Sequence, residues 1–177
     1  MKQVIISFLC VFIFTLSACK SDDGIDSEVK KVSENVLSTN ATTFLKTHFQ
    51  QIKTKEVNQF EPKKPNGVTY EVALNNDVLV DFDEVGNWVS VESQGKGEIP
   101  KSIIHASIIS YTSKKYPTIG FNKIERNSTG YFVELMGDID LNFDKNGEFV
   151  ERLPYLIIYL LLLSNISTNL KTSKTSF

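Results

Sequence analysis

The feature that most constrains the fold of this chain is an internal repeat. A shift of 61 residues moves Tyr70 onto Tyr131, and the two registers then run together without a gap as far as Val89 and Val150. The matched side chains are of the same kind: Val78 and Ile139, Val80 and Leu141, Phe82 and Phe143, Asp83 and Asp144, Gly86 and Gly147, Trp88 and Phe149. Self-similarity at a fixed period is typical of duplicated structural units, so the sequence predicts two copies of one module.

Upstream of each copy, the match continues at a shift of 67 residues and has a helical pattern. The aligned residues are Phe44, Phe49, Ile52 and Val57 with Tyr111, Tyr116, Ile119 and Ile124. The first helix is expected to follow an N-cap at Ser38, and its apolar stripe is Ala41, Phe44, Leu45, His48 and Phe49. In the second copy, Pro100 suits the first helical turn and Pro117 should stop the helix after Tyr116. The shift is larger here because the first copy carries an extra loop, residues 61–66.

Three strand-like runs follow each helical pattern. Period-2 alternation is clearest in residues 70–74 and 78–82 and in their equivalents, 131–135 and 139–143. Residues rich in Asn, Asp and Gly separate the runs, as in hairpin turns. The expected fold class is therefore α+β: two tandem helix-plus-three-strand repeats, with an antiparallel sheet and the helices packed on one face.

The segment before the repeats has the pattern of a bacterial export signal. Lys2 precedes an apolar run from Val4 to Phe14, about eleven residues, whereas a bilayer-spanning helix needs about 20. The run ends in residues 16–19, Leu-Ser-Ala-Cys, which resembles a lipobox in which Cys19 receives a lipid after cleavage. An uncleaved signal anchor with an incidental Cys19 is the alternative. Cleavage would remove Cys10 and leave one sulfur, already a thioether, so neither a disulfide nor cysteine catalysis is expected.

These patterns divide the chain into five parts. They are a signal peptide (1–18), a linker after the lipidated cysteine (19–34), the first repeat (35–92), the second repeat (99–152) and a tail (153–177). Residues 20–24 resemble the acidic signal that sends lipoproteins of Bacteroidota-type bacteria to the outer face of the outer membrane, and a solvated linker is the alternative. The tail begins with an apolar run too short to span a bilayer. An unusual extension, a membrane-surface contact and a translated frameshift all remain open for it.

The repeats resemble a known family. Each closes with Phe-Asp-x-x-Gly-x-aromatic, at residues 82–88 and 143–149, and residues 44–49, 99–102 and 116–117 are similar to the family's helix entries and exits. The family is the β-lactamase-inhibitor-like, PepSY-like family of secreted Bacteroidota proteins. This resemblance, over residues 35–152, implies an αβββ-type module found in tandem, with no catalytic residues and with protein inhibitors among its relatives. The resemblance does not carry a function to this chain by itself.

Composition and motifs exclude several functions. The chain of 177 residues has 19 Lys+Arg against 21 Asp+Glu, which argues against nucleic-acid binding. The acidic turns at Asp83 and Asp144 suggest calcium, but the second lacks the Glu expected at its twelfth position and hairpin-turn chemistry explains both. His48 and His105 are expected to be half-exposed structural residues, because no metal-ligating or catalytic cluster surrounds them. We therefore expect no cofactor, no metal site and no catalytic residue.

Four residues are candidates for partner binding. Lys63 and Lys64 lie in the extra loop of the first copy, where two prolines restrict the chain and positive charge suits an acidic surface. Strand alternation sends Phe132 to the face opposite the helices, and Trp88 is a candidate for the same face. The alternatives are a tolerated insertion with solvated lysines, and a packing role for Trp88 with its equivalent Phe149.

The expected function is that of a non-enzymatic, lipid-anchored binding module of the bacterial cell envelope, tethered to the outer membrane by Cys19. Its partner is expected to be a protein, such as a hydrolase that it inhibits. The alternatives are a structural envelope protein and an enzyme that uses carboxylates from both copies, such as Asp83 and Asp144. The enzyme requires these two turns to meet in space, within the ~10 Å limit for paired glycosidase carboxylates. Periplasmic and surface-exposed positions both remain open.

Overall fold

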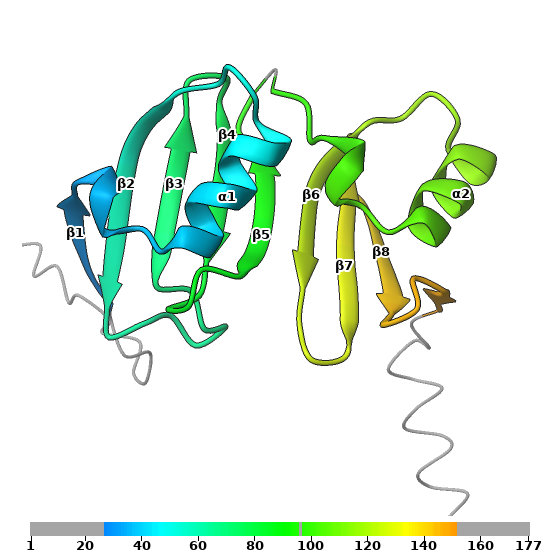
Figure 1. The fold of residues 1–177 in the computed structure, drawn as a ribbon. Coiled ribbons are helices and arrows are strands. Elements are labelled where there is room, and N and C mark those ends of the chain that lie inside the picture. The colour runs from blue at the N-terminus through cyan, green and yellow to red at the C-terminus, as the bar shows by residue number, and fades with distance from the viewer. Residues whose placement is uncertain (1–26, 96, 152–177) are drawn as a thin grey trace, which may run out of the picture.

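The computed structural model describes residues 27–95 and 97–151, which form one nine-stranded antiparallel sheet with two helices against one of its faces (Figure 1). The strands follow one another along the sheet in chain order. Their bounds are β1 (Glu28–Val32), β2 (Thr54–Glu61), β3 (Tyr70–Leu74), β4 (Val78–Phe82), β5 (Trp88–Ser93), β6 (Phe121–Arg126), β7 (Gly130–Leu135), β8 (Ile139–Asp144) and β9 (Phe149–Val150). The helices are α1 (Thr39–His48) and α2 (Ala106–Lys115), each preceded by a 3-10 turn, η1 (Glu34–Val36) and η2 (Lys101–Ile103).

The duplication is confirmed, but each helix is followed by four strands and not by three. Strands β2 and β6 were missed because each places a single residue in the core beneath the helices, Val57 in β2 and Ile124 in β6. One buried residue on the core face gives no alternation to detect. The segment expected to be a linker also contains β1, which pairs with β2 from Glu28 opposite Glu61 to Val32 opposite Val57.

Both helices begin in the same way. In each copy a 3-10 turn leads to a buried apolar residue, Leu37 or Ile104, and then to the N-cap, Ser38 or His105. The Ser38 side chain accepts from the Ala41 amide at 3.3 Å, which confirms the expected cap. The expectation for Pro100 was wrong: it opens η2, because Ile104 and His105 are extended and delay α2 until Ala106.

The two copies share one sheet and one core. Strand β5 of the first copy pairs with β6 of the second, with Val91 opposite Ile124, so no sheet edge lies between them. Both residues are fully buried in a hydrophobic cluster that also contains Phe82 and Phe143. The two copies thus pack as one unit.

Candidate functional site

Trp88 packs under α1. One of our two interpretations placed it on the open face of the sheet, opposite the helices, and that placement was wrong. Its ring stacks on Phe44 at a centroid distance of 6.1 Å, and Phe82 meets Phe44 edge-on at 5.7 Å. The second copy repeats the arrangement with Tyr111, which stacks on Phe149 at 4.7 Å and meets Phe143 edge-on at 5.5 Å. Trp88 and Phe149 thus stack on equivalent helix rings, the packing that was the alternative expected for this pair. Trp88 lies on the helix face because a bulge at Phe82 changes the register of β4 with β5.

The acidic turn after β4 is held against the start of α1. The Asp83 carboxylate accepts from the backbone amides of Val85 and Asn87, at 3.1 and 2.7 Å, and the Val85 carbonyl accepts from the Ser38 hydroxyl at 3.1 Å. Gly86 has φ +86° and lies so close to Ser38 that a Cβ atom would overlap its hydroxyl. The Phe-Asp-x-x-Gly motif is thus explained by turn geometry and by close contact with the helix.

The second copy uses Asp144 in the same way, with amides at 2.9 Å. Asp83 and Asp144 end β4 and β8, which are four strand spacings apart, or about 19 Å at the usual spacing. The structure does not bring this carboxylate pair together. In the described part of the chain, no three His, Cys, Asp or Glu side chains are grouped to hold a metal ion.

The extra loop of the first copy crosses the open face, beside two buried apolar residues. Val68 is fully buried and Phe60 is 7% exposed, and neither belongs to the core beneath the helices. The Lys64 ammonium lies 3.8 Å from the centre of the Phe60 ring and 3.7 Å from the Glu71 carboxylate. Lys64 is therefore held down on the sheet, whereas Lys63 is exposed.

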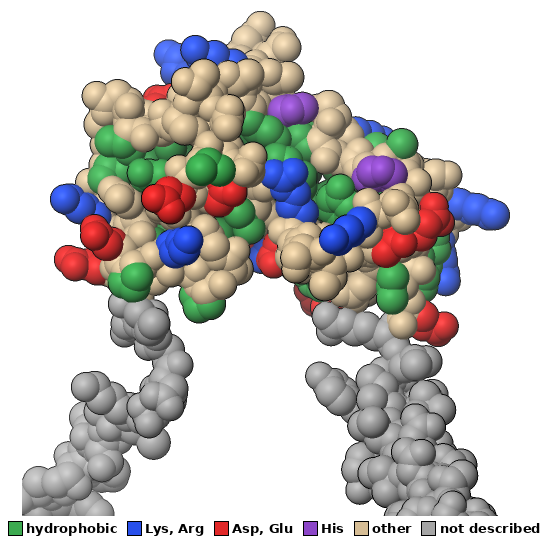
Figure 2. Space-filling view, turned by 60° about the horizontal axis from the view of Figure 1, so that its bottom comes forward, with side chains coloured by type: hydrophobic (Ala, Val, Ile, Leu, Met, Phe, Trp, Pro, Cys, Tyr) green, Lys and Arg blue, Asp and Glu red, His purple; other side chains and the backbone are tan. Residues whose placement is uncertain are grey.

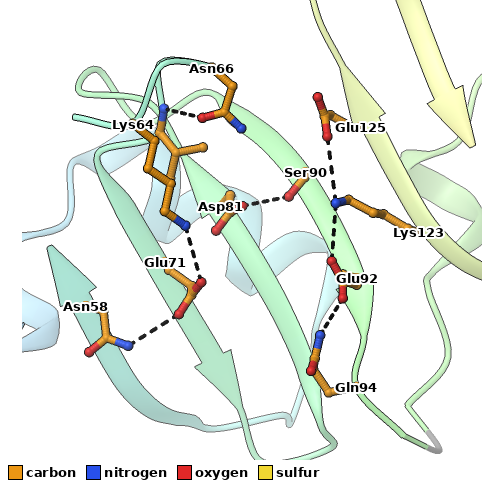
Figure 3. Close-up of polar contacts among 11 residues, drawn as sticks. Asn58, Lys64, Asn66, Glu71, Asp81, Ser90, Glu92, Gln94, Lys123 and Glu125 are labelled. Atoms are coloured by element: carbon orange, nitrogen blue, oxygen red, sulfur yellow. Dashed lines mark hydrogen bonds and ion pairs between the residues drawn. The ribbon is translucent and has the colours of Figure 1, made fainter. Parts of the chain in front are cut away.

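The open face itself is covered by polar side chains that bind one another (Figure 3). Glu92 lies 3.3 Å from the Lys123 ammonium, and Glu125 lies 3.8 Å from it. Phe132 is on this face, as alternation predicted, and its β-partners are Glu125 and Asn142. It is partly buried and does not line the groove described below.

Asp81 is a partly buried acid of this face. Its Oδ2 accepts from the Ser90 hydroxyl at 2.8 Å, while its buried Oδ1 has no hydrogen-bond partner among the described residues. Burial raises the pKa of the Asp81 carboxyl above its ordinary value of 3.8, and the hydrogen bond from Ser90 opposes this shift.

The two histidines have structural roles, as expected. Nδ1 of His48 lies 2.9 Å from the Ser102 hydroxyl, so it links α1 to η2, and partial burial lowers the pKa of His48. Nδ1 of His105 accepts from the Ser107 amide at 3.3 Å and caps α2.

A groove of about 960 Å³ lies at the end of the sheet where β2, β4 and β6 finish, which is the lower end in Figure 1. The hairpin turns of both copies meet there. We call it the lower groove. Its walls are residues 63 and 65–67 of the extra loop, residues 83–85 and 87–89, residues 125–128, 130 and 131, and Lys145. Figure 2 views this end, and Lys and Arg side chains lie along the boundary between the two halves. The lower groove brings together Lys63 and Trp88, but not Lys64 or Phe132.

Arg126 lines the lower groove and, like Tyr131 and Lys145, was not a candidate from the sequence. Its Nε donates to the Trp88 carbonyl at 2.6 Å, and its guanidinium lies 4.5 Å from the centre of the Trp88 ring. The contact joins residues 38 positions apart across the junction of the two copies. No local sequence pattern marks such a pair, because it depends on the pairing of β5 with β6.

The sequence of the chain matches one protein-family model twice. The model for the family described as "putative beta-lactamase-inhibitor-like, PepSY-like" matches residues 21–84 and again residues 68–151, which together span more than half of the chain. The chain belongs to the PepSY-like family. The double match of this PepSY-like protein confirms the tandem repeat. No curated protein matches the chain.

Three solved structures from Bacteroides resemble this PepSY-like protein. A "putative calcium-regulated periplasmic protein" of Bacteroides thetaiotaomicron is 29% identical, with a TM-score of 0.62 over 70% of this chain and 94% of the other. A putative periplasmic protein of Bacteroides vulgatus is 27% identical, with a TM-score of 0.61 over 72% and 98%. A second one from that species, of unknown function, is 26% identical, with a TM-score of 0.62 over 71% and 97%.

Three segments interpreted from the sequence lie outside the described residues. They are the lipidation site at Cys19 with its signal peptide, the acidic segment at 20–24, and the tail at 153–177. Within residues 27–95 and 97–151, no helix has the length and apolar character needed to cross a membrane.

Proposed function

We propose that this protein is a non-enzymatic, lipid-anchored binding module of the bacterial cell envelope and that its lower groove holds a protein partner. The compartment is supported by the export and lipobox pattern ending at Cys19 and by three structural relatives described as periplasmic. The outer membrane is the proposed site of anchoring. The family description, inhibitor-like, makes a hydrolase the first class of partner to test.

One observation carries the proposal: the lower groove collects Trp88, Arg126 and Tyr131 at the junction of the two copies. Tryptophan, arginine and tyrosine are the residue types most enriched among those that dominate protein–protein binding energy. The three come from the first copy, from β6 and from β7, so the duplication builds a surface that neither copy has alone.

A carboxylate enzyme is supported less well. Asp83 lines the lower groove but its oxygens accept from the amides of its own turn, and Asp144 does not line it. The spacing of about 19 Å between β4 and β8 exceeds the ~10 Å within which paired carboxylates share one substrate bond.

Site-specific photo-crosslinking in the native envelope tests the proposal. A photoreactive residue replaces Lys63 in the lower groove or, as a control, the exposed Lys114 on α2. We expect position 63 to capture one stoichiometric protein that position 114 does not capture. Recovery of the same assembly neighbours from both positions would indicate a structural envelope protein instead.

A further inference from the structure

The guanidinium of Arg126 is fixed in place before any partner arrives. Its Nε donates to the Trp88 carbonyl at 2.6 Å, and its guanidinium carbon lies over the Trp88 ring, 4.5 Å from the ring centre. Arginine has five N–H donors, so four of them remain after the Trp88 contact. A guanidinium held in this way loses little conformational freedom when it binds a ligand. Its planar set of N–H donors matches an acceptor with two oxygens, such as a carboxylate.

Arg126 is partly buried, yet no carboxylate among the described residues forms an ion pair with it. Charged groups that are withdrawn from water are usually paired. The Arg126 guanidinium is therefore a charge without a counter-charge, at the wall of the lower groove.

The other basic groups of the lower groove are also left without an acidic partner in the described chain. The exposed Lys63 and Lys145 take part in none of the hydrogen bonds or ion pairs that join described residues, and both line the groove. Of the three acids that line it, Asp83 is bound to its own turn and Glu125 lies 3.8 Å from Lys123. The lining thus has three acids and three basic groups, but only one acid, Glu84, has neither a basic partner nor amide donors in the described chain, whereas none of the three basic groups has an acidic partner there.

We propose that the lower groove binds an acidic segment of a protein partner and that Arg126 receives a side-chain carboxylate of that segment through its two terminal nitrogens. Lys63 and Lys145 attract the flanking acids, and Trp88 and Tyr131 supply the apolar contact. This inference rests on the proposed function, because it names the chemistry of the partner in the same groove.

Trp88 makes the test direct because it is the only tryptophan of the chain, so tryptophan fluorescence, excited selectively over that of the six tyrosines, reports on the surroundings of this one residue. The full chain is titrated with a blocked hexaglutamate peptide, and then with blocked hexaglutamine and hexalysine. We expect a saturable change in Trp88 fluorescence with hexaglutamate only, weakened when salt is raised to about 0.5 M.

Variants then assign the binding to Arg126. We expect Arg126→Gln to weaken hexaglutamate binding by about tenfold or more, the loss of a charge-assisted hydrogen-bond pair, and Arg126→Lys not to restore it. Lys115→Gln is the matched control, since the Lys115 ammonium lies 5.7 Å from the ring centre of Tyr111 in the equivalent stack of the second copy. The Lys115→Gln variant is expected to bind like wild type, and thermal melts show whether each variant folds.

The two lysines of the groove should contribute less. Lys63→Gln and Lys145→Gln, both at exposed positions, should weaken hexaglutamate binding by about two- to fivefold.

Three results would overturn the inference: equal binding of hexaglutamine, unchanged binding by a folded Arg126→Gln variant, or saturation by anionic lipid vesicles without any by the peptide. If crosslinking at position 63 captures a partner while hexaglutamate does not bind, the acidic-segment inference fails and the proposed function stands. If hexaglutamate binds through Arg126 but no partner is captured, the proposed function fails instead.

Discussion

Single residues show most clearly how the duplication works. Phe82 is fully buried and Phe143 is 3% exposed, and each meets the aromatic ring of its own helix edge-on, Phe44 or Tyr111. Edge-to-face pairs of this kind add to the burial of apolar area. The same geometry in both copies means that equivalent changes should have equivalent costs.

We predict that Phe82→Ala and Phe143→Ala each lower the free energy of unfolding by about 3 to 5 kcal/mol, because each leaves a cavity in the core. Chemical denaturation with urea measures the loss. A variant that unfolds at the wild-type denaturant concentration would contradict the placement of that phenylalanine in the core.

A second residue-scale prediction separates the two constraints on Gly86. Gly86 and Gly67 have nearly the same positive φ, +86° and +87°, but only Gly86 lies against a neighbour, the Ser38 hydroxyl. Gly67→Ala should therefore lower the free energy of unfolding by about 1 to 2 kcal/mol, the penalty for an L-residue in the left-handed backbone region. Gly86→Ala should cost clearly more, because the new methyl group displaces the cap of α1. Equal shifts in thermal denaturation midpoint would show that the contact with Ser38 is unimportant.

At the scale of elements, the sequence identified the strands that bury several residues on one face. Strands β3, β4, β7 and β8 alternate, and they were found with their turns. Strand β1, with the sequence EVKKV and no fully buried residue, has no such signal, and its place depends on pairing with β2. The face of Trp88 was equally out of reach, because the bulge opposite Phe82 breaks the alternation.

The extra loop shows the same limit for the candidate site. Sequence reasoning treated Lys63 and Lys64 alike, and only the fold distinguishes them. Phe60, three residues after Val57, faces the side opposite the core, so the loop returns across it and Lys64 lies over the ring. Long loops commonly cover small satellite clusters. The loop is thus partly structural, and Lys63 is the lysine left for a partner.

The open face yields a prediction about pH. Burial raises the folded-state pKa of Asp81 above 3.8, so the folded protein favours the protonated carboxyl. The contribution of Asp81 to stability is therefore fully present below pH 3.8 and is lost as the pH rises through the folded pKa. Relative to Asp81→Asn, the wild type should become less stable as the pH is raised from about 3 to 7. Urea denaturation of both proteins at several pH values measures the difference, and a constant difference would contradict the assignment.

At the scale of the whole molecule, one continuous sheet sets the orientation of the lower groove. Strand β1 begins at Glu28, paired with Glu61 at the end of β2, and this is the end of the sheet from which the extra loop departs (Figure 1). The chain therefore enters the sheet at the groove end. If Cys19 carries the lipid, residues 20–27 are the whole tether, and eight residues reach at most about 29 Å. A lipid at Cys19 would then hold the groove end of the sheet close to the membrane surface.

The last prediction tests that tether. Cys19→Ser removes the sulfur that receives the lipid in the proposed lipobox, so the protein should leave the membrane fraction or remain unprocessed. Stable membrane anchoring depends on several acyl chains, since a single chain gives only marginal binding. A processed protein that has lost the lipid of Cys19 should therefore leave the membrane for the most part. Cys10→Ser is the matched control, because Cys10 lies within the apolar run that cleavage discards. Fractionation and the mass of the mature protein report both changes. If the Cys19→Ser variant stays in the membrane fraction with the mass of a processed protein, as the Cys10→Ser control should, then the anchor is not at Cys19. A lipid on Cys19 would then not be what holds the groove at the membrane.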